Sequence, residues 1–130
     1  MNERQMLSKV NFHLIPGLFS AFQTDLKLYL VLPLMEKGDL RYHITKFKYF
    51  REKDVRFFTA CLVSVLEYLH GRGIIHRDVK PENLLLDHYG YLHLTDLGIS
   101  QKLEDVCPGN CCGTPPYMAP EVLFEKEYGL

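Results

Sequence analysis

The sequence lacks an excess of charge of either sign, a low-complexity segment and an internal repeat. Its 15 basic and 16 acidic residues give a formal net charge of −1, so no basic surplus favours nucleic acid or an anionic membrane surface as a partner. No apolar run approaches the roughly 20 residues of a membrane-spanning helix. The start of the chain, MNERQMLSKV, has no apolar core of signal-peptide length, so nothing favours secretion.

Cysteine is scarce as well, with Cys61, Cys107, Cys111 and Cys112 the whole complement. A reduced chain is the simpler expectation, and it favours an intracellular protein, cytoplasmic with the nucleus not excluded. The last three cysteines do not have the spacing of a zinc pair, and no histidine follows them. We therefore expect free thiols there and no metal site.

What is present is an ordinary globular composition, with 47% apolar residues in 130. This is enough for one small domain with a core. The clearest pattern covers residues 55–69, where apolar side chains recur at i, i+3 and i+4 and predict a helix that Gly71 and Gly73 end. The other elements that we expect are a helix ending near residue 10, strands 18–22 and 26–32, a helix 40–47, and a hairpin of strands 84–86 and 91–94.

One stretch, IIHRDVKPENLLLD at residues 74–87, concentrates polar groups between apolar runs. Asp78 precedes Lys80 by two residues and Asn83 by five. Polar groups beside a core must be hydrogen-bonded or used. Further along, residues 96–121 show no sustained periodicity, and a loop of that length in a compact domain is usually functional or disordered.

Three motifs stand in order along the chain: H-R-D at 76–78 with Asn83, D-L-G at 96–98, and A-P-E at 119–121. Their order resembles the eukaryotic protein kinases, whose signature is H-R-D followed by Asn, then D-F-G, then A-P-E. The resemblance covers essentially all of the chain, from the family's αC helix to just past A-P-E. It implies an α+β fold of the two-lobe kinase type, truncated at both ends.

The resemblance divides the chain into an N-lobe remnant with the hinge, residues 1–35, and a C-lobe with the catalytic loop and activation segment, residues 36–130. The implied activity is ATP-dependent transfer of the γ-phosphate to a serine or threonine hydroxyl of protein substrates, with Mg²⁺. A lysine two residues after the aspartate, as in Lys80, marks the serine/threonine kinases within this family.

The implied catalytic residues are Asp78, Lys80, Asn83 and Thr114, and the implied metal ligands are Asn83 and Asp96. Asp78 would accept the substrate hydroxyl's proton, and Lys80 would bind the transferred phosphate. Carboxylate and amide oxygens, as in Asp96 and Asn83, suit Mg²⁺. Thr114 matches the threonine that bonds the catalytic aspartate and lysine. The alternative is a capped turn at Asp78 and Asn83, bonded to local backbone, with Thr114 a plain loop residue.

The implied nucleotide-binding residues are Glu3, Leu32, Pro33, Met35, Asp39 and Leu85. Leu32 matches the residue that controls the back of the adenine pocket. The hinge would offer adenine the Pro33 carbonyl and the backbone N–H and C=O of Met35. Leu85 would lie under the adenine ring, and Asp39 would reach the ribose or a substrate arginine. The apolar spine that joins the two lobes is matched by Leu7, Leu18, His76 and Leu97, for which a plain core role is equally compatible.

The segments GDLRYHI and GTPPYMAPEV are most similar to the AGC group, with the YANK-type branch as the closer expectation and the calmodulin-dependent kinases as the rival. Asp39 and Glu82 are acidic where arginine-directed kinases bind basic residues of the substrate. We therefore expect protein substrates with basic residues before the acceptor, although both carboxylates could equally be solvated surface groups.

Two departures from the family pattern lie in the C-terminal half. Leu97 replaces the phenylalanine of D-F-G, a change expected to alter packing rather than chemistry. Asn110 stands where AGC kinases often carry a phosphorylated threonine, so phosphorylation there is not expected. Glu104 or Asp105 is expected to pair with Arg77 in place of the phosphate.

A third departure concerns two features of the family, its glycine-rich loop and a lysine on a strand that follows that loop. In the family both precede the residue matched by Met1. Glu3, the match to the αC glutamate, therefore has no designated partner in this sequence. Two hypotheses follow: a segment of an active kinase, and a nucleotide-poor pseudokinase segment that acts as a protein-binding module. The 130 residues by themselves are expected to show negligible kinase activity.

Overall fold

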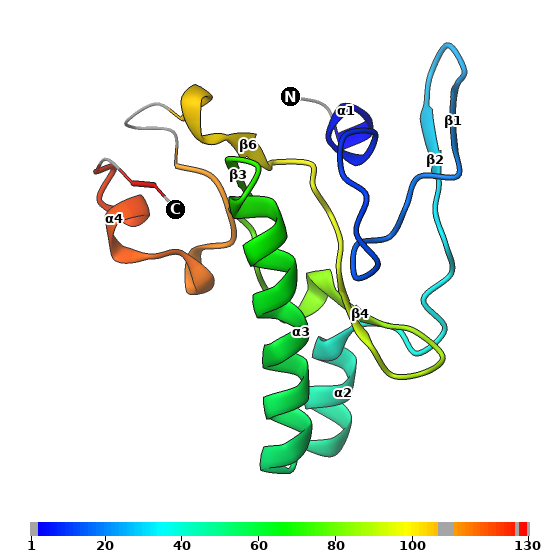
Figure 1. Cartoon of the computed structure of the whole chain (residues 1–130), viewed down its shortest axis with the longest axis vertical. Helices are drawn as coiled ribbons and strands as arrows, with labels where there is room; N and C mark the ends of the chain where they lie inside the picture. Colours follow the sequence, from blue (N-terminus) through cyan, green and yellow to red (C-terminus); the bar gives the residue numbers. More distant parts are fainter. Residues whose placement is uncertain (1–2, 107–110, 127, 130) are drawn as a thin grey trace.

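The computed structural model describes residues 3–106, 111–126 and 128–129. In these ranges the helices are short apart from α3, and all strands pair as antiparallel two-stranded sheets, an α+β arrangement (Figure 1). The elements, with η for a short 3₁₀ helix, are α1 (Glu3–Leu7), β1 (Ser20–Gln23), β2 (Leu28–Val31), α2 (Leu40–Phe47), α3 (Glu52–His70), β3 (Ile74–Ile75), η1 (Pro81–Asn83), β4 (Leu84–Leu86), β5 (Leu92–Leu94), β6 (Gln101–Lys102), η2 (Leu103–Asp105), η3 (Pro115–Tyr117) and α4 (Pro120–Leu123).

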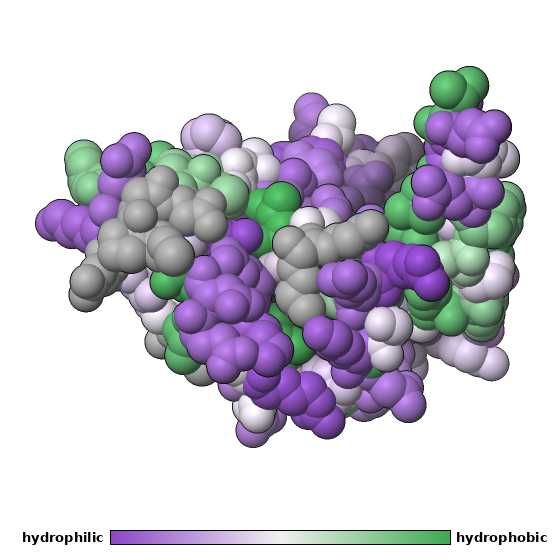
Figure 2. Space-filling model, turned by 90° about the horizontal axis from the view of Figure 1, so that it is seen from above, coloured by the Kyte–Doolittle hydropathy of each residue, from purple (hydrophilic) through white to green (hydrophobic). Residues whose placement is uncertain are grey.

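β1 and β2 form a hairpin that stands apart from α2 and α3 (Figure 1). Both strands were predicted, but Gln23 belongs to β1, and the turn is closed by the Thr24 N–H donating to the Lys27 carbonyl at 2.8 Å. Figure 2 shows apolar surface gathered on the side where this hairpin lies, as expected for a two-stranded sheet with little cover. The exposed apolar side chains here are Phe19, Phe22, Leu26, Leu28, Tyr29 and Val31.

α2 spans the residues predicted for it. Asp39 caps its N-terminus, because the Asp39 Oδ1 accepts a hydrogen bond from the Tyr42 N–H at 2.8 Å. Lys48 ends the helix in the left-handed conformation with φ 62°, and its N–H donates to the Ile44 carbonyl. The helix contacts η1 and β4, so it borders the segment that carries the polar cluster.

α3 is the central helix and begins three residues earlier than the predicted range of 55–69. Its fully buried residues Cys61, Val65 and Leu69 recur every four positions and lie on the face that contacts β5. Gly71 is still right-handed, with φ −60°, whereas Gly73 has φ 66° and turns the chain into β3. The prediction that glycine ends this helix is thus confirmed, with the left-handed turn at the second glycine.

The core joins α1, the loop after it, α3 and the β4–β5 hairpin. A hydrogen bond from the Leu94 N–H to the Leu14 carbonyl, 3.0 Å long, fixes the N-terminal loop to the hairpin. Leu97, which replaces the family's phenylalanine, is buried in this core. The buried members are Met6, Leu7, Val10, Leu14, Ile15, Cys61, Val65, Leu69, Ile74, Leu84, Leu86, Leu92, Leu94 and Leu97.

The β4–β5 hairpin carries the polar cluster at its open end. Leu84 pairs with Leu94, and the Thr95 N–H donates to the Asn83 carbonyl at 3.0 Å, which extends the pairing one step beyond the strands. The Asp87 carboxylate holds the turn by accepting from two backbone N–H groups. This geometry brings the residues that follow Thr95 beside those that precede β4.

For residues 96–121 we expected a functional or disordered loop, and the described part of this range contains β6, η2, η3 and the start of α4. β6 pairs with β3, and Ile75 lies opposite Gln101. Strands of two residues show no alternation that a sequence pattern could reveal. In the described residues, no helix has both the length and the apolar composition needed to cross a membrane.

Candidate functional site

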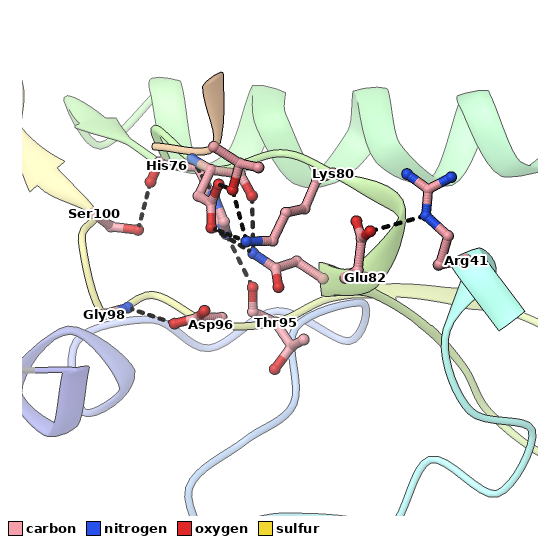
Figure 3. A network of polar contacts seen from close by, with 11 residues as sticks. Arg41, His76, Lys80, Glu82, Thr95, Asp96, Gly98 and Ser100 are labelled. Atoms are coloured by element: carbon pink, nitrogen blue, oxygen red, sulfur yellow. Dashed lines mark hydrogen bonds and ion pairs between the residues drawn. The ribbon is translucent and has the colours of Figure 1, made fainter. Parts of the chain in front are cut away.

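The backbone that leads into the site is organised by His76, which is buried in the core. The Asp78 N–H donates to the His76 Nδ1 at 3.2 Å, so the ring's other nitrogen carries the proton and donates to the Thr95 carbonyl at 3.1 Å (Figure 3). Burial lowers the pKa of His76, which favours this neutral form. His76 thereby fixes the chain before Asp78 to the segment that leads to Asp96.

Asp78, Lys80 and Thr114 form a closed triangle of hydrogen bonds. The Lys80 Nζ lies 2.7 Å from the Asp78 Oδ2 and 2.8 Å from the Thr114 Oγ1. The Thr114 hydroxyl in turn donates to the Asp78 Oδ1 at 2.6 Å. The triangle joins residues that are 36 positions apart in the sequence and ties the segment before η3 to the segment between β3 and η1.

Asn83 completes the cluster around Asp78. Its side-chain Nδ2 donates to the Asp78 carbonyl at 2.9 Å and to the Asp78 Oδ2 at 3.1 Å. Both N–H bonds of the amide are therefore used, and the Asn83 Oδ1 has no hydrogen-bond partner among the described residues. An amide oxygen held in this way is a suitable ligand for a hard cation.

The charges of the cluster stabilise one another. Burial alone would raise the Asp78 pKa, but the hydrogen bonds from Lys80, Thr114 and Asn83 outweigh it and hold the pKa below its usual value. The pKa of Lys80 is raised, first by its hydrogen bond to Asp78 and further by the Asp96 carboxylate. Asp78 is therefore an ionised acceptor at neutral pH, and Lys80 is a fixed cation beside it.

Asp96 lies across from Lys80 in an exposed position (Figure 3). Its backbone is left-handed, with φ 62°, a conformation that costs a non-glycine residue energy and recurs at functional sites. The Asp96 Oδ1 accepts from the Gly98 N–H at 3.2 Å. The second oxygen has no such partner in the described part of the chain, so Asp96 and the Asn83 Oδ1 together offer the hard oxygen donors that Mg²⁺ prefers.

Glu3 starts α1 on the same side of the molecule as Asp96. Burial raises the pKa of Glu3, and the Asp96 carboxylate adds to the rise. Two carboxylates that repel each other in this way favour a cation between or beside them. The position expected to match the αC glutamate therefore lies within electrostatic reach of the expected metal ligand.

The predicted hinge is half-buried at Leu32, Pro33 and Met35. In the described residues, the Pro33 carbonyl and the Met35 N–H have no hydrogen-bond partner, while the Met35 carbonyl accepts from the Gly38 N–H at 3.1 Å. Leu85 is also half-buried and bridges to Asp39 through a β-type backbone contact. The predicted hinge therefore keeps one free acceptor and one free donor among the described residues, whereas the Met35 carbonyl is already engaged.

Gly113 shows why the activation segment can reach the catalytic loop. It has φ 126°, and a Cβ at this position would lie 2.6 Å from the Arg77 carbonyl oxygen. Only glycine permits that approach, which places the next residue, Thr114, within reach of Asp78 and Lys80.

We expect Gly113→Ala to lower the free energy of unfolding of the full-length protein by about 1–3 kcal/mol, through the contact with the Arg77 carbonyl and the strained φ. Urea denaturation would measure the loss. Gly17→Ala is the matched control, because a Cβ there meets nothing within 4 Å. Equal unfolding midpoints for the two variants would contradict this account of the close approach.

Among the described residues, Arg77 forms no ion pair with Glu104, so the predicted pairing with Glu104 was wrong. The Arg77 Nε donates to the Ile99 carbonyl at 2.7 Å, while Glu104 pairs with Lys102 at 2.6 Å. Lys102 ends β6 and Glu104 lies two residues later in η2, so the two side chains are close in sequence, whereas Arg77 is half-buried and bonded to Ile99. The Arg77 Nη1 is buried without a partner in the described residues. Asn110 and Cys107 lie outside the described residues.

Sequence reasoning missed a second polar cluster beside the first. The Arg41 Nε pairs with the Glu82 Oε1 at 2.8 Å (Figure 3), and a terminal nitrogen of Arg41 donates to the Tyr117 hydroxyl. The Glu82 pKa is lowered by this hydrogen bond, and the Arg41 pKa is raised by it. The cluster ties α2, η1 and η3 together, and no local pattern signals a contact between positions 41 and 117.

Among the described residues, Cys61 and Cys111 are free thiols. Cys61 is buried in the core, Cys111 is exposed and Cys112 is partly exposed. The Cys111 thiol contacts the Met118 sulfur at 3.9 Å. In the described residues, no group of three or more His, Cys, Asp or Glu side chains is arranged to hold a metal.

Comparison with known proteins places this site in a family. The whole chain, residues 1–130, matches the protein kinase domain. The chain belongs to the protein kinase family, and its α+β fold is the kinase fold that the motif order predicted.

Three relatives illustrate the group within the family. A RAC family serine/threonine-protein kinase homolog of Dictyostelium discoideum is 43% identical over 99% of this chain and 30% of its own length. Ribosomal protein S6 kinase alpha-2 of Mus musculus is 47% identical over 95% of this chain and 17% of its own. Protein kinase C eta type of Homo sapiens is 42% identical over 99% of this chain and 19% of its own. The chain therefore spans less than a third of each relative.

These relatives are serine/threonine kinases of the AGC group, which confirms the AGC-like expectation over the calmodulin-dependent rival. The YANK-type branch is not tested by them and stays a prediction.

Proposed function

We propose that the protein containing this chain is a serine/threonine kinase that transfers the γ-phosphate of ATP to protein substrates, with Mg²⁺. The observation that carries the proposal is the triangle of Asp78, Lys80 and Thr114, which aligns a base and a cation at one point. Phosphoryl transfer needs alignment and neutralisation of charge more than covalent help. The triangle supplies alignment and a cation.

The hydrogen bonds made by Asp78 favour one of its two carboxylate oxygens as the proposed base. A carboxylate has about four lone-pair directions. On Asp78 the Oδ2 accepts from both Lys80 and Asn83, whereas the Oδ1 accepts from Thr114 alone. The Oδ1 therefore keeps a lone pair for the substrate hydroxyl, whose proton it takes as the oxygen attacks the phosphorus.

The hydrogen bonds made by Lys80 leave one of its N–H groups for the transferred phosphate. An ammonium group has three donors, and the described residues use two of them, on Asp78 and Thr114. Thr114 holds the ammonium by accepting from it and holds the carboxylate by donating to it. The threonine thus fixes the spacing between base and cation, the geometry on which proximity effects depend.

We assign Asn83 and Asp96 to Mg²⁺, which would neutralise the phosphate oxygens when bound. The hinge carbonyl of Pro33 and the N–H of Met35 would bind the adenine, Leu32 and Leu85 would border it, and Glu3 would help to complete the phosphate end of the site. Asp39 uses one oxygen to cap α2, and its Oδ2 has no partner among the described residues, so it can still reach a ribose or a substrate arginine.

We further propose a preference for basic residues before the acceptor, read by Asp39 and Glu82. Glu82 already carries an ion pair with Arg41, so its share of this preference depends on Arg41. We also propose an intracellular place of action, cytoplasmic or nuclear, which the use of ATP and the free thiols of Cys61 and Cys111 support.

The test is transfer of labelled phosphate from Mg-ATP by the full-length protein to peptides that differ only in the acceptor: Ser, Thr, Tyr or Val. We expect label on the Ser and Thr peptides alone, because Lys80 matches the lysine that marks the serine/threonine kinases within this family. Omitting Mg²⁺ should abolish the transfer. Label on none of the peptides would favour the protein-binding alternative, and label on Tyr alone would overturn the substrate class.

A further inference from the structure

The cluster of Arg41, Glu82 and Tyr117 lies at the rim of the proposed acceptor site. Glu82 directly precedes Asn83 in η1, and Tyr117 follows Thr114 by three residues in η3. Arg41 reaches both from α2, with its Nε on Glu82 at 2.8 Å, another nitrogen on the Tyr117 hydroxyl, and its guanidinium carbon 6.0 Å from the centre of the Tyr117 ring. The Arg41 guanidinium therefore already forms an ion pair with the Glu82 carboxylate.

The contacts of Arg41 with Glu82 and Tyr117 resemble those that an arginine of a bound substrate would form. A guanidinium offers five N–H donors in a planar fork and binds a carboxylate and an aromatic hydroxyl together. Arg41 forms the ion pair with Glu82 that a substrate arginine would form, but Arg41 belongs to the protein itself. A substrate arginine must displace it before it can pair with Glu82.

We propose that Arg41 is a specificity-determining residue, which fills the acidic position at Glu82 and so weakens selection for basic substrates. The inference rests on the proposed kinase function and refines its substrate class. With Arg41 in place, a substrate arginine exchanges one ion pair for another and gains little. Peptides with a neutral residue at this position are then accepted almost as well, and the remaining basic preference comes from Asp39.

The exposure of the pair sets the size of the effect. The side chains of Arg41 and Glu82 are 41% and 44% exposed, so solvent screens the ion pair. A screened pair of this kind changes binding by a factor of about two to five. Removing Arg41 should therefore change the selectivity by a few-fold and leave the fold intact.

The experiment compares peptides with arginine or its neutral isostere citrulline at each of the five positions before the acceptor. The readout is the ratio of kcat/KM for the two peptides of a pair. In the full-length Arg41→Ala variant we expect this ratio to rise about fivefold at one position, because Glu82 is released. Adding Glu82→Gln should return the ratio to its wild-type value. Glu82→Gln alone should change it little, since Arg41 already neutralises that carboxylate.

The matched control is Arg51→Ala, which removes an exposed arginine from a pair of the same length, 2.8 Å, with Asp54. It should leave every ratio unchanged. Arg41→Gln is the second variant and should behave as Arg41→Ala does. Ratios equal to wild type in both Arg41 variants, with citrulline peptides still phosphorylated, would overturn the inference and leave the kinase function standing. Failure of the wild-type protein to phosphorylate any peptide would instead overturn the proposed function, and the inference with it.

Discussion

Asp78→Asn is expected to lower kcat for phosphate transfer by a factor of about 10²–10⁴, the contribution typical of a positioned general base. The amide that replaces the carboxylate has a single oxygen and no negative charge. It can no longer accept from Thr114, Lys80 and Asn83 and also take a proton, so the base is lost and the cation loses its partner. Steady-state kinetics with a serine peptide would measure the loss.

Two controls separate this effect from a general disturbance of the fold. Asp54→Asn changes an exposed aspartate that pairs with Arg51 on α3, and it should leave kcat unchanged. The KM for ATP should change little in Asp78→Asn, because Asp78 is placed to touch the acceptor and not the nucleotide. A kcat within about threefold of wild type would show that Asp78 is not the base.

The pH profile offers a further check on the same residue. The hydrogen bonds around Asp78 hold its pKa below the usual value even though burial opposes this. A lowered pKa keeps the carboxylate ionised further into acid. When kcat is measured against pH, the apparent pKa of the acid limb should therefore lie below the ordinary aspartate value of about 3.9. An apparent pKa above that value would contradict the assignment of this limb to Asp78.

The sequence predicted the elements whose signals are local. The helix 40–47 was predicted with its observed bounds, and the structure shows that Asp39 caps its N-terminus. The β4–β5 hairpin was predicted from two apolar runs around a turn, although Tyr91 lies outside the strand. The motif order predicted one site from five residues: Asp78, Lys80, Asn83, Asp96 and Thr114. The structure joins all of these except Asp96 in one hydrogen-bonded cluster.

What the sequence did not predict depends on contacts between distant residues. The pairing of β3 with β6 joins two-residue strands that carry no alternation. The link from Arg41 to Tyr117 crosses 76 positions, and neither segment has a pattern that marks the partner. For Glu104 the sequence analysis predicted Arg77 as the partner, whereas the structure pairs it with Lys102. A long polar side chain can reach several partners, so the distances in the folded structure determine which hydrogen bond or ion pair forms.

Asp96→Asn is the second change for which we expect a large loss. Asp96 is one of the two proposed metal ligands. Its carboxylate shares one negative charge between both oxygens, and one of these oxygens has no hydrogen-bond partner among the described residues. Replacing it with an amide removes that charge, so the concentration of Mg²⁺ needed for half-maximal activity should rise, and kcat should fall by a factor on the order of 10³. A titration of activity against Mg²⁺ would measure both, and binding of Mn²⁺ followed by electron paramagnetic resonance would report the metal site without catalysis.

Asp25→Asn is the control for this change, because Asp25 is an exposed aspartate in the turn between β1 and β2, on the hairpin that stands apart from the site. It should leave the Mg²⁺ titration and the Mn²⁺ affinity at their wild-type values. Asp96→Asn should weaken Mn²⁺ binding while the triangle of Asp78, Lys80 and Thr114 stays intact, since none of its hydrogen bonds involves Asp96. Unchanged Mn²⁺ affinity would remove Asp96 from the metal site and leave the base at Asp78 to be judged separately.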